Sequence, residues 1–359
     1  MQESNWKFYT SNDETLEAMI SACESATKTI ELEQFIFCTD EYGNKLIDIC
    51  AKKASDGVKV RFLWDAAGSF TFSGAETIKN LKEKGIELLF FKTLLPALFD
   101  APNYRSWYFR NHRRSLIIDG KTCLTGSICI DETKKDWRDT SVLMNSPIAF
   151  EMQKSFEQMW NRSKGTRSSR RKKKIQNINE FKYINNQPFP RKRVLYRQIV
   201  EAIRNSEKYI YITTPYFVPT HRIARVLRLA AHRGVDVRIL IPERSDHAIV
   251  DLAARTYFSN LLKSKIRIFT YKDRMIHNKT LVIDDNWSSI GTLNIDHISL
   301  LYNFEANIIS TNKKFTEELK SHFMTDISNS NEVTQEQWDK RYWVEKFAGF
   351  FIKFIRSLF

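Results

Sequence analysis

Two stretches of the chain share one spacing of residues whose side chains suit phosphate chemistry. Each reads histidine, one residue, a cation, four residues, aspartate, six residues, and then glycine followed by a hydroxyl residue. The members are His112, Arg114, Asp119, Gly126 and Ser127 in the first stretch, and His277, Lys279, Asp284, Gly291, Thr292 and Asn294 in the second. A histidine can act as nucleophile or as acid and base, and a cation with small donors can neutralise a phosphate. The repeated pattern favours phosphoryl transfer.

Short, mainly apolar strands are predicted to carry the two motifs. Residues 115–118 and 280–283 end in Asp-Gly and Asp-Asp turns. Histidine and cation are two residues apart, so on a strand their side chains would point to the same face, where one phosphate could contact both. Asp119 and Asp284 are expected to fix turns or make supporting contacts rather than touch substrate. One such histidine would more often be structural, but two with matching offsets favour function.

Similarity between the two parts extends beyond the motifs. Three further stretches match in the same order, with predicted helices between them. The matched pairs are 27–37 with 207–217, 56–61 with 233–238, and 85–91 with 265–271, and the helical stretches are 14–26, 46–55 and 222–231. Strands that alternate with helices indicate an α/β fold in each half. One large α/β domain with chance similarity is the alternative, but four landmarks in one order favour duplication.

These residues resemble the phospholipase D superfamily, and more closely the bacterial cardiolipin synthases. The signature is HxKxxxxD followed by GSxN, and the supporting stretches are 33–37, 137–140, 214–219, 245–247 and 303–305. The second motif departs only at Thr292, which keeps the hydroxyl. The first has Arg114 for lysine, which still binds phosphate, and Cys129 for asparagine, which is a weaker donor. The resemblance runs from about Asn12 to the C-terminus. It implies two similar phospholipase D-like α/β/α sandwich halves with the active site between them.

The resemblance also implies transfer through a phosphohistidine. One histidine attacks the phosphodiester, and the other protonates the leaving alcohol and then activates the incoming one. We assign His112 as nucleophile and His277 as acid and base. The phosphate-binding residues would be Arg114, Lys279, Ser127, Thr292 and Asn294. The scheme requires no cofactor and no metal, and no cluster of His, Cys and Asp in the sequence has zinc or calcium spacing.

Two carboxylates are candidates to orient the histidines, because a neutral histidine needs an acceptor at its second ring nitrogen. Glu305 lies 28 residues after His277, and Asp139 lies 27 residues after His112. This near-equal offset is the reason for the assignment. Each could instead be an ordinary surface carboxylate.

The charge of the chain indicates an anionic partner. The 359 residues carry a formal net charge of +14. Eight of the cations crowd one serine-containing stretch, namely Arg162, Lys164, Arg167, Arg170, Arg171, Lys172, Lys173 and Lys174. Lipid head groups or nucleic acid would suit this charge, and a solvated linker is an equal alternative for the stretch. The predicted organisation is a first half at 1–160, a basic linker at 161–195, a second half at 196–330 and an amphipathic C-terminal tail at 331–359.

Membrane attachment is predicted to be peripheral and on the cytoplasmic side. No run approaches the ~20 apolar residues of a membrane span, and no signal peptide opens the chain, although many cardiolipin synthases begin with membrane-spanning helices. Five cysteines without a CxxC pair suggest free thiols in a reducing compartment. Residues 342–359 interleave aromatic side chains with Lys346, Lys353 and Arg356, which favours an amphipathic helix at a bilayer interface. Docking onto the body is the alternative.

The main functional prediction is a phosphatidyltransferase of the cardiolipin synthase type, which moves a phosphatidyl group between phosphatidylglycerol molecules. Its partners would be anionic phospholipid and the membrane surface, with no protein partner inferred. Water as acceptor would give a phospholipase D, and the basic linker would suit a nuclease of the same superfamily. The absence of a recognised nucleic-acid module and the aromatic C-terminus argue against nucleic acid. A non-catalytic lipid-binding module ranks last, because both histidines are present.

Overall fold

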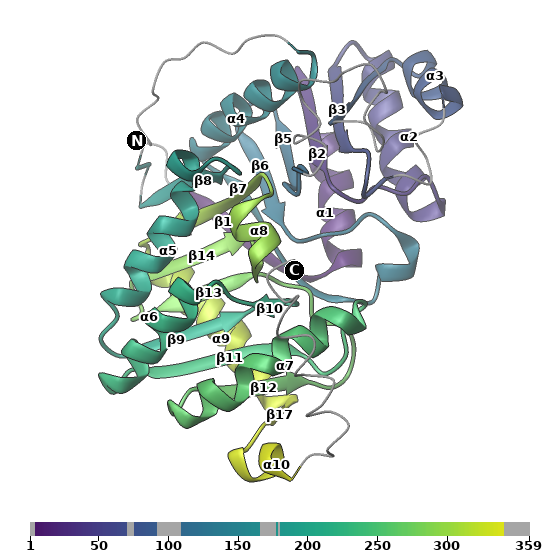
Figure 1. The fold of residues 1–359 in the computed structure, drawn as a ribbon. Coiled ribbons are helices and arrows are strands. Elements are labelled where there is room, and N and C mark those ends of the chain that lie inside the picture. The colour runs from purple at the N-terminus through teal and green to yellow at the C-terminus, as the bar shows by residue number, and fades with distance from the viewer. Residues whose placement is uncertain (1–3, 70–74, 92–108, 166–176, 179, 341–359) are drawn as a thin grey trace.

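The computed structural model describes residues 4–69, 75–91, 109–165, 177–178 and 180–340. Its strands form two large mixed sheets that follow one another along the chain (Figure 1). The first has seven strands in the order β1-β7-β6-β5-β2-β3-β4. They are β1 (Asn5–Ser11), β2 (Thr29–Gln34), β3 (Lys59–Asp65), β4 (Ile86–Phe91), β5 (Ser115–Ile118), β6 (Thr122–Gly126) and β7 (Arg138–Asn145).

The second sheet has eight strands in the order β17-β12-β11-β9-β13-β14-β16-β8. They are β8 (Phe181–Asn186), β9 (Tyr209–Thr213), β11 (Asp236–Pro242), β12 (Arg267–Tyr271), β13 (Thr280–Ile283), β14 (Trp287–Gly291), β16 (Glu305–Ser310) and β17 (Ser330–Glu332). A separate parallel pair joins β10 (Phe217–Val218) to β15 (Ile295–Asp296).

Both sheets repeat one arrangement. Parallel strands β2, β3 and β4 correspond to β9, β11 and β12. The motif strand then joins antiparallel, as β5 beside β2 and as β13 beside β9. Two further antiparallel strands follow, β6 and β7 in the first sheet and β14 and β16 in the second. The expected α/β fold with two similar halves is therefore confirmed.

Helices cover both faces of each sheet. In the first half, α1 (Asn12–Glu24) and α2 (Glu41–Ser55) share one apolar cluster with the sheet, and α4 (Ile148–Ser163) packs in another on the opposite face. In the second half, α5 (Val194–Arg204), α6 (His221–His232) and α7 (Ala248–Lys263) cover one face and α9 (Lys313–Ser328) the other. The shorter helices are α3 (Ala75–Glu83), α8 (His297–Leu301), α10 (Gln335–Asp339), η3 (Glu132–Lys134) and η4 (Pro190–Lys192). None of the helices in the described part combines the length and apolar character needed to cross a bilayer.

Side-chain caps explain where the predicted helices begin. The carboxylate of Asp40 accepts the backbone N–H of Gly43, so α2 starts five residues before the predicted stretch 46–55. The hydroxyl of Thr220 accepts the N–H of Ile223 and starts α6. Polar residues at a cap thus move a helix boundary that apolar periodicity alone misplaces.

One apolar cluster belongs to both halves. It contains Met152 and Phe156 of α4 together with Phe315 and Phe323 of α9. Phe8 of β1 also packs on Phe315, with the ring centroids 4.8 Å apart. Since burying a large aromatic side chain contributes about 2 kcal/mol or more, this shared cluster holds the two halves against each other. In Figure 1 the first half, which begins in purple, accordingly lies directly on the second, which ends in yellow.

Strand β8 lies inside the stretch predicted as a linker, 161–195. It pairs antiparallel with β16, as β1 pairs with β7, so it is the second half's counterpart of β1. Its sequence FKYINN carries polar residues that obscure a strand. The second structural unit therefore starts earlier than the predicted residue 196. The basic residues at 166–176 and the tail at 341–359 lie outside the described residues.

Candidate active site

Backbone pairing brings each histidine to the opposite half. The N–H of His112 donates to the carbonyl of Phe304, at 2.9 Å, just before β16. The N–H of His277 donates to the carbonyl of Arg138, at 2.8 Å, at the start of β7. Each histidine precedes its motif strand, so the two meet where the halves face each other. The site expected between the halves is thus built by two reciprocal backbone contacts.

Each histidine also contacts a carboxylate of the other half. His112 Nδ1 lies 3.0 Å from the carboxylate of Glu305, and His277 Nδ1 lies 3.0 Å from Asp139 Oδ2. The sequence offset associated each carboxylate with the histidine of its own half. In the structure, each carboxylate instead contacts the histidine of the other half. Both carboxylates are fully buried, so they are not surface groups. With Nδ1–H directed at a carboxylate, Nε2 of each neutral ring carries the lone pair that can attack phosphorus or take up a proton.

A cation lies beside Nε2 of each histidine. The two terminal nitrogens of Arg114 are 3.2 and 3.3 Å from His112 Nε2, and Lys279 Nζ is 2.9 Å from His277 Nε2. This is the same-face geometry expected for residues two apart on a strand. Arg114 Nε is buried without a partner among the described residues, so it can donate to a ligand. The reactive nitrogen of each histidine therefore lies beside a positive charge.

The motif hydroxyls hold the carboxylates. Ser127 Oγ donates to Asp139 Oδ1, and Thr292 Oγ1 donates to Glu305 Oε2 at 2.6 Å. We expected both hydroxyls on the phosphate, but their protons point to carboxylates. Asn294 differs, because its buried Oδ1 has no partner in the described part while Nδ2 donates to a serine 3.3 Å away.

The glycines of both motifs are explained by close backbone approach. A Cβ on Gly126 would lie 2.6 Å from the carbonyl oxygen of Thr140, and one on Gly291 would lie 2.4 Å from that of Ala306. Such distances are too short for any side chain. Glycine lets β6 and β14 run against the strands that carry the orienting carboxylates.

The motif aspartates lie at the far ends of the motif strands. The carboxylate of Asp119 accepts three backbone N–H groups, from Thr27 and the two residues after it. The carboxylate of Asp284 accepts those of Glu207 and its two successors. Both aspartates adopt left-handed backbone, at φ 52° and 53°. They tie the turn after the motif strand to the start of β2 and β9, away from the histidines.

Burial and like charge keep the histidines neutral in the free enzyme. Burial, then Arg114 and Lys279, lower the pKa of His112 well below its usual value. Burial and Lys279 lower the pKa of His277 to about 3. Burial and the neighbouring Arg114 also lower the pKa of Lys279 to about 7. Arg114 and Lys279 each lower the pKa of groups in both halves. A bound anion would relieve this repulsion between positive charges.

The two orienting carboxylates differ in their charge. Burial raises the pKa of Glu305 to about 8, despite the hydrogen bond from Thr292. Burial acts in the same sense on Asp139, but the hydrogen bond from His277 and the positive charge of Lys279 outweigh it and lower that pKa. Asp139 is therefore the stronger acceptor for a positive imidazole.

Two buried carboxylates behind His112 escaped the sequence reasoning. Asp65, the last residue of β3, accepts the backbone N–H of Asn111 at 2.8 Å and Nε of Arg110 at 2.9 Å. Glu33 accepts Nδ2 of Asn111 at 2.7 Å and Nε of Arg113 at 3.0 Å. Together they fasten the residues on both sides of His112. Glu33 is the first residue of a stretch that carries the family resemblance. This resemblance was the only feature of the sequence that pointed to either carboxylate.

Aromatic rings flank both histidines. The ring of Phe35 lies 4.7 Å from that of His112, and the ring of Trp137 lies 5.0 Å from that of His277, between centroids. Both side chains are partly exposed. Each ring therefore lies directly beside the imidazole of one histidine.

One group of possible metal ligands lies elsewhere in the first half. The ligand atoms of Cys38, Asp40 and Asp131 lie within 4.8 Å of one another. Asp40 already caps α2, and Asp131 accepts the N–H of Thr133 and an ion pair from Lys134. These contacts satisfy the two carboxylates. The three residues are far apart in the sequence, so their spacing did not indicate the group.

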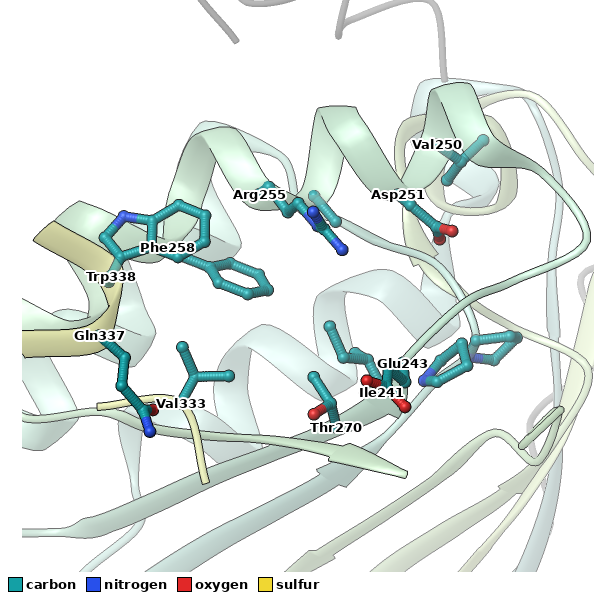
Figure 2. A pocket seen from close by; sticks show the side chains of 13 residues that line it. Ile241, Glu243, Val250, Asp251, Arg255, Phe258, Thr270, Val333, Gln337 and Trp338 are labelled. Carbon is teal, nitrogen blue, oxygen red and sulfur yellow. The ribbon is translucent and has the colours of Figure 1, made fainter. Parts of the chain in front are cut away.

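A cavity of about 230 Å³ opens beneath α7. Figure 2 shows Arg255 and Asp251 of α7 reaching toward it, with Phe258 and Trp338 at one end. Neither histidine lines it. This cavity is therefore separate from the paired histidines, which form the candidate active site.

Known proteins are similar to this chain over most of its length. A family model described as "Cardiolipin synthase, PLD-like domain" matches residues 19–160 and 199–327. Cardiolipin synthase 1 of Bacillus anthracis is 32% identical, covering 98% of this chain and 72% of the relative. The cardiolipin synthase of Halalkalibacterium halodurans is 33% identical, covering 95% and 69%.

Solved structures show the same fold at much lower identity. Phosphatidylserine synthase of Haemophilus influenzae Rd KW20 superposes with a TM-score of 0.74 at 13% identity, over 99% of this chain and 95% of that one. Polyphosphate kinase of Porphyromonas gingivalis gives 0.62 at 12% identity, over 99% and 54%. These likenesses concern the fold alone.

Proposed function

Since the chain belongs to the cardiolipin synthase family of phospholipase D-like proteins and is a phosphatidyltransferase, we propose that it converts two phosphatidylglycerol molecules into cardiolipin and glycerol between its halves. The observation that carries this proposal is the pair of histidines, each held at Nδ1 by a buried carboxylate and facing a cation at Nε2. Two such groups can divide nucleophilic and acid-base work.

In the first step, His112 Nε2 attacks the phosphorus of the donor. A P–N bond forms, and the P–O bond to the glycerol head group breaks. His277 Nε2–H gives its proton to the leaving oxygen. Arg114 and Lys279 neutralise the non-bridging oxygens, where charge accumulates.

In the second step, a hydroxyl of the acceptor phosphatidylglycerol loses its proton to His277 Nε2 and attacks phosphorus. The P–N bond breaks, and its electrons return to His112. The products are cardiolipin and free enzyme. Water in place of the acceptor would give phosphatidic acid.

The carboxylates support the assignment of the two roles. His277 must carry a proton before the leaving group departs, and ionised Asp139 favours that state. The free enzyme opposes it through burial and the charge of Lys279, but an anionic phosphodiester offsets that charge. Binding of the donor would therefore favour the protonated form of His277. His277 would thus take up its proton after the substrate has bound.

The substrate surface is proposed to be an anionic membrane, met peripherally from the cytoplasmic side. The formal net charge of +14 suits such a surface. No protein partner and no cofactor enter the proposal.

The test is mass spectrometry of lipids after incubation with phosphatidylglycerol vesicles. We expect cardiolipin and glycerol in equal amounts, and none with the His112→Ala variant. Phosphatidic acid as the main product would make the protein a hydrolase. Unchanged lipid together with cleavage of added DNA would make it a nuclease and refute the proposal.

A further inference from the structure

A buried ion pair crosses between the halves beside the His277–Asp139 pair. Arg138 opens β7, one residue before Asp139, and Asp326 lies in α9 of the other half. Arg138 Nε is 2.8 Å from Asp326 Oδ1, and Arg138 Nη2 is 2.8 Å from Oδ2. The two residues are only 5% and 2% exposed. The pairing is bidentate, so it fixes direction as well as distance.

Other contacts of Arg138 lie around Asp139 and His277. Its Nη1 donates to the carbonyl of Asp139 and, at 3.0 Å, to the hydroxyl of Thr140. Its own carbonyl accepts the N–H of His277 at 2.8 Å. Arg138 thus contacts the backbone of Asp139 and the backbone of His277.

Arg138 cannot reach the substrate from this position. Side chains alternate along a strand, so Asp139 faces His277 while Arg138 faces α9. Its guanidinium is occupied by protein groups on that far side. Any influence on the reaction must therefore act through Asp139 and His277.

The other histidine is fastened differently. The residue before Glu305 is Phe304, whose carbonyl pairs with His112 as that of Arg138 pairs with His277. Phe304 is buried against Phe91, with the ring centroids 5.5 Å apart. Packing of aromatic rings holds Phe304 in place, whereas an ion pair holds Arg138. Stability alone does not require the charges, because apolar residues can often replace a buried ion pair without loss.

We infer that Arg138 and Asp326 are positioning residues for the His277–Asp139 pair and thereby set how well the leaving alcohol is protonated. The inference rests on the proposed function, in which His277 is the acid. Bidentate contacts hold a group to a fraction of an ångström, and a displacement of about 1 Å can cost roughly 100-fold in rate. Loosening α9 from Arg138 should impair proton transfer and leave lipid binding intact.

The test compares Asp326→Asn with wild type on two donors. One is phosphatidylglycerol, whose glycerol must be protonated as it leaves. The other is phosphatidyl-p-nitrophenol, whose p-nitrophenolate leaves without a proton. We expect kcat for phosphatidylglycerol to fall by roughly 100-fold at unchanged KM. The burst of p-nitrophenolate should stay near the wild-type rate.

Two further variants guard against a simple folding defect. The double variant Arg138→Met with Asp326→Leu removes both charges and should keep the fold while showing the same selective loss. Trp6→Phe is the matched control, since Trp6 Nε1 donates to Glu318 of α9 at 3.0 Å and also joins the first half to this helix. It should leave both donors at the wild-type rate.

His277→Ala separates the two ways of failing. It should lose turnover of phosphatidylglycerol and keep the p-nitrophenolate burst. If it does, equal loss on both donors in Asp326→Asn, or no loss, overturns the positioning inference and leaves the proposed function standing. If His277→Ala abolishes the burst, His277 is not the acid, and both the assignment and this inference fall.

Discussion

Replacing Glu305 by glutamine should stabilise the protein at alkaline pH and destroy its activity. Glu305 is fully buried and contacts His112 and Thr292. Glutamine keeps nearly the same shape and an oxygen to accept Nδ1–H, but it cannot ionise. It also cannot balance the positive charge that His112 carries once it is bonded to phosphorus. The two effects have opposite signs because the buried charge serves the reaction and not the fold.

The size of the stability effect follows from the pKa of the group. Burial raises the pKa of Glu305 from 4.5 to about 8. A carboxyl with a raised folded pKa binds its proton more tightly in the folded state, so its contribution is most favourable below pH 4.5 and is lost as the pH rises toward 8. At about 1.4 kcal/mol per pH unit, wild type should lose roughly 3 kcal/mol relative to Glu305→Gln between pH 5 and pH 8.

Urea unfolding at pH 5 and pH 8 measures this change, with Glu201→Gln as the control because Glu201 is exposed on α5. The stability difference between Glu305→Gln and wild type should grow with pH, while that of the control stays constant. Turnover should fall on the order of 10⁴-fold, as when the carboxylate behind a catalytic histidine is neutralised. A difference independent of pH would show that Glu305 is ionised in the folded protein. Wild-type turnover would remove it from the mechanism.

Three further results are expected. His112→Ala and His277→Ala should each lower cardiolipin formation by at least about 10²–10⁴-fold with an unchanged circular dichroism spectrum, and near-normal turnover in either would exclude a two-histidine mechanism. Arg114→Lys should keep substantial activity and Arg114→Ala should not, because charge beside the phosphate is the requirement; equal activity of alanine and wild type would refute this. Deleting residues 342–359, which lie outside the described part, should weaken sedimentation with anionic vesicles far more than turnover of a soluble short-chain substrate, and high salt should weaken binding of the full chain. Sedimentation like wild type would place membrane contact elsewhere.

Local pattern was enough to predict the strands and the faces of their side chains. Histidine and cation two residues apart share a face on any strand, and the apolar runs at 115–118 and 280–283 coincide with β5 and β13. Repetition of these features along the chain then predicted two similar α/β halves. All of this information lies within a few residues of sequence, where strand and helix periods act.

The exchange of carboxylates between the halves could not be predicted in the same way. The offsets from His112 to Asp139 and from His277 to Glu305 are real, but they reflect duplication and not contact. Contact is decided by how the halves pack, through the cluster around Phe156 and Phe315, and no local period records that packing. Asp65 and Asp326 were missed for the same reason, since each meets its partner only in the folded chain.

The two departures of the first motif from the family signature compensate each other in space. Arg114 replaces a smaller lysine and Cys129 replaces a larger asparagine, and Arg114 Nη2 lies 3.8 Å from Cys129 Sγ. The small thiol leaves room for the guanidinium, whose fork offers several N–H donors where an ammonium and an amide would share the task. Arg114 Nε still lacks a partner among the described residues. The hydrogen bond that the missing asparagine would have made to phosphate can therefore come from Arg114 itself, so the first half need not grip the phosphate more weakly than the second.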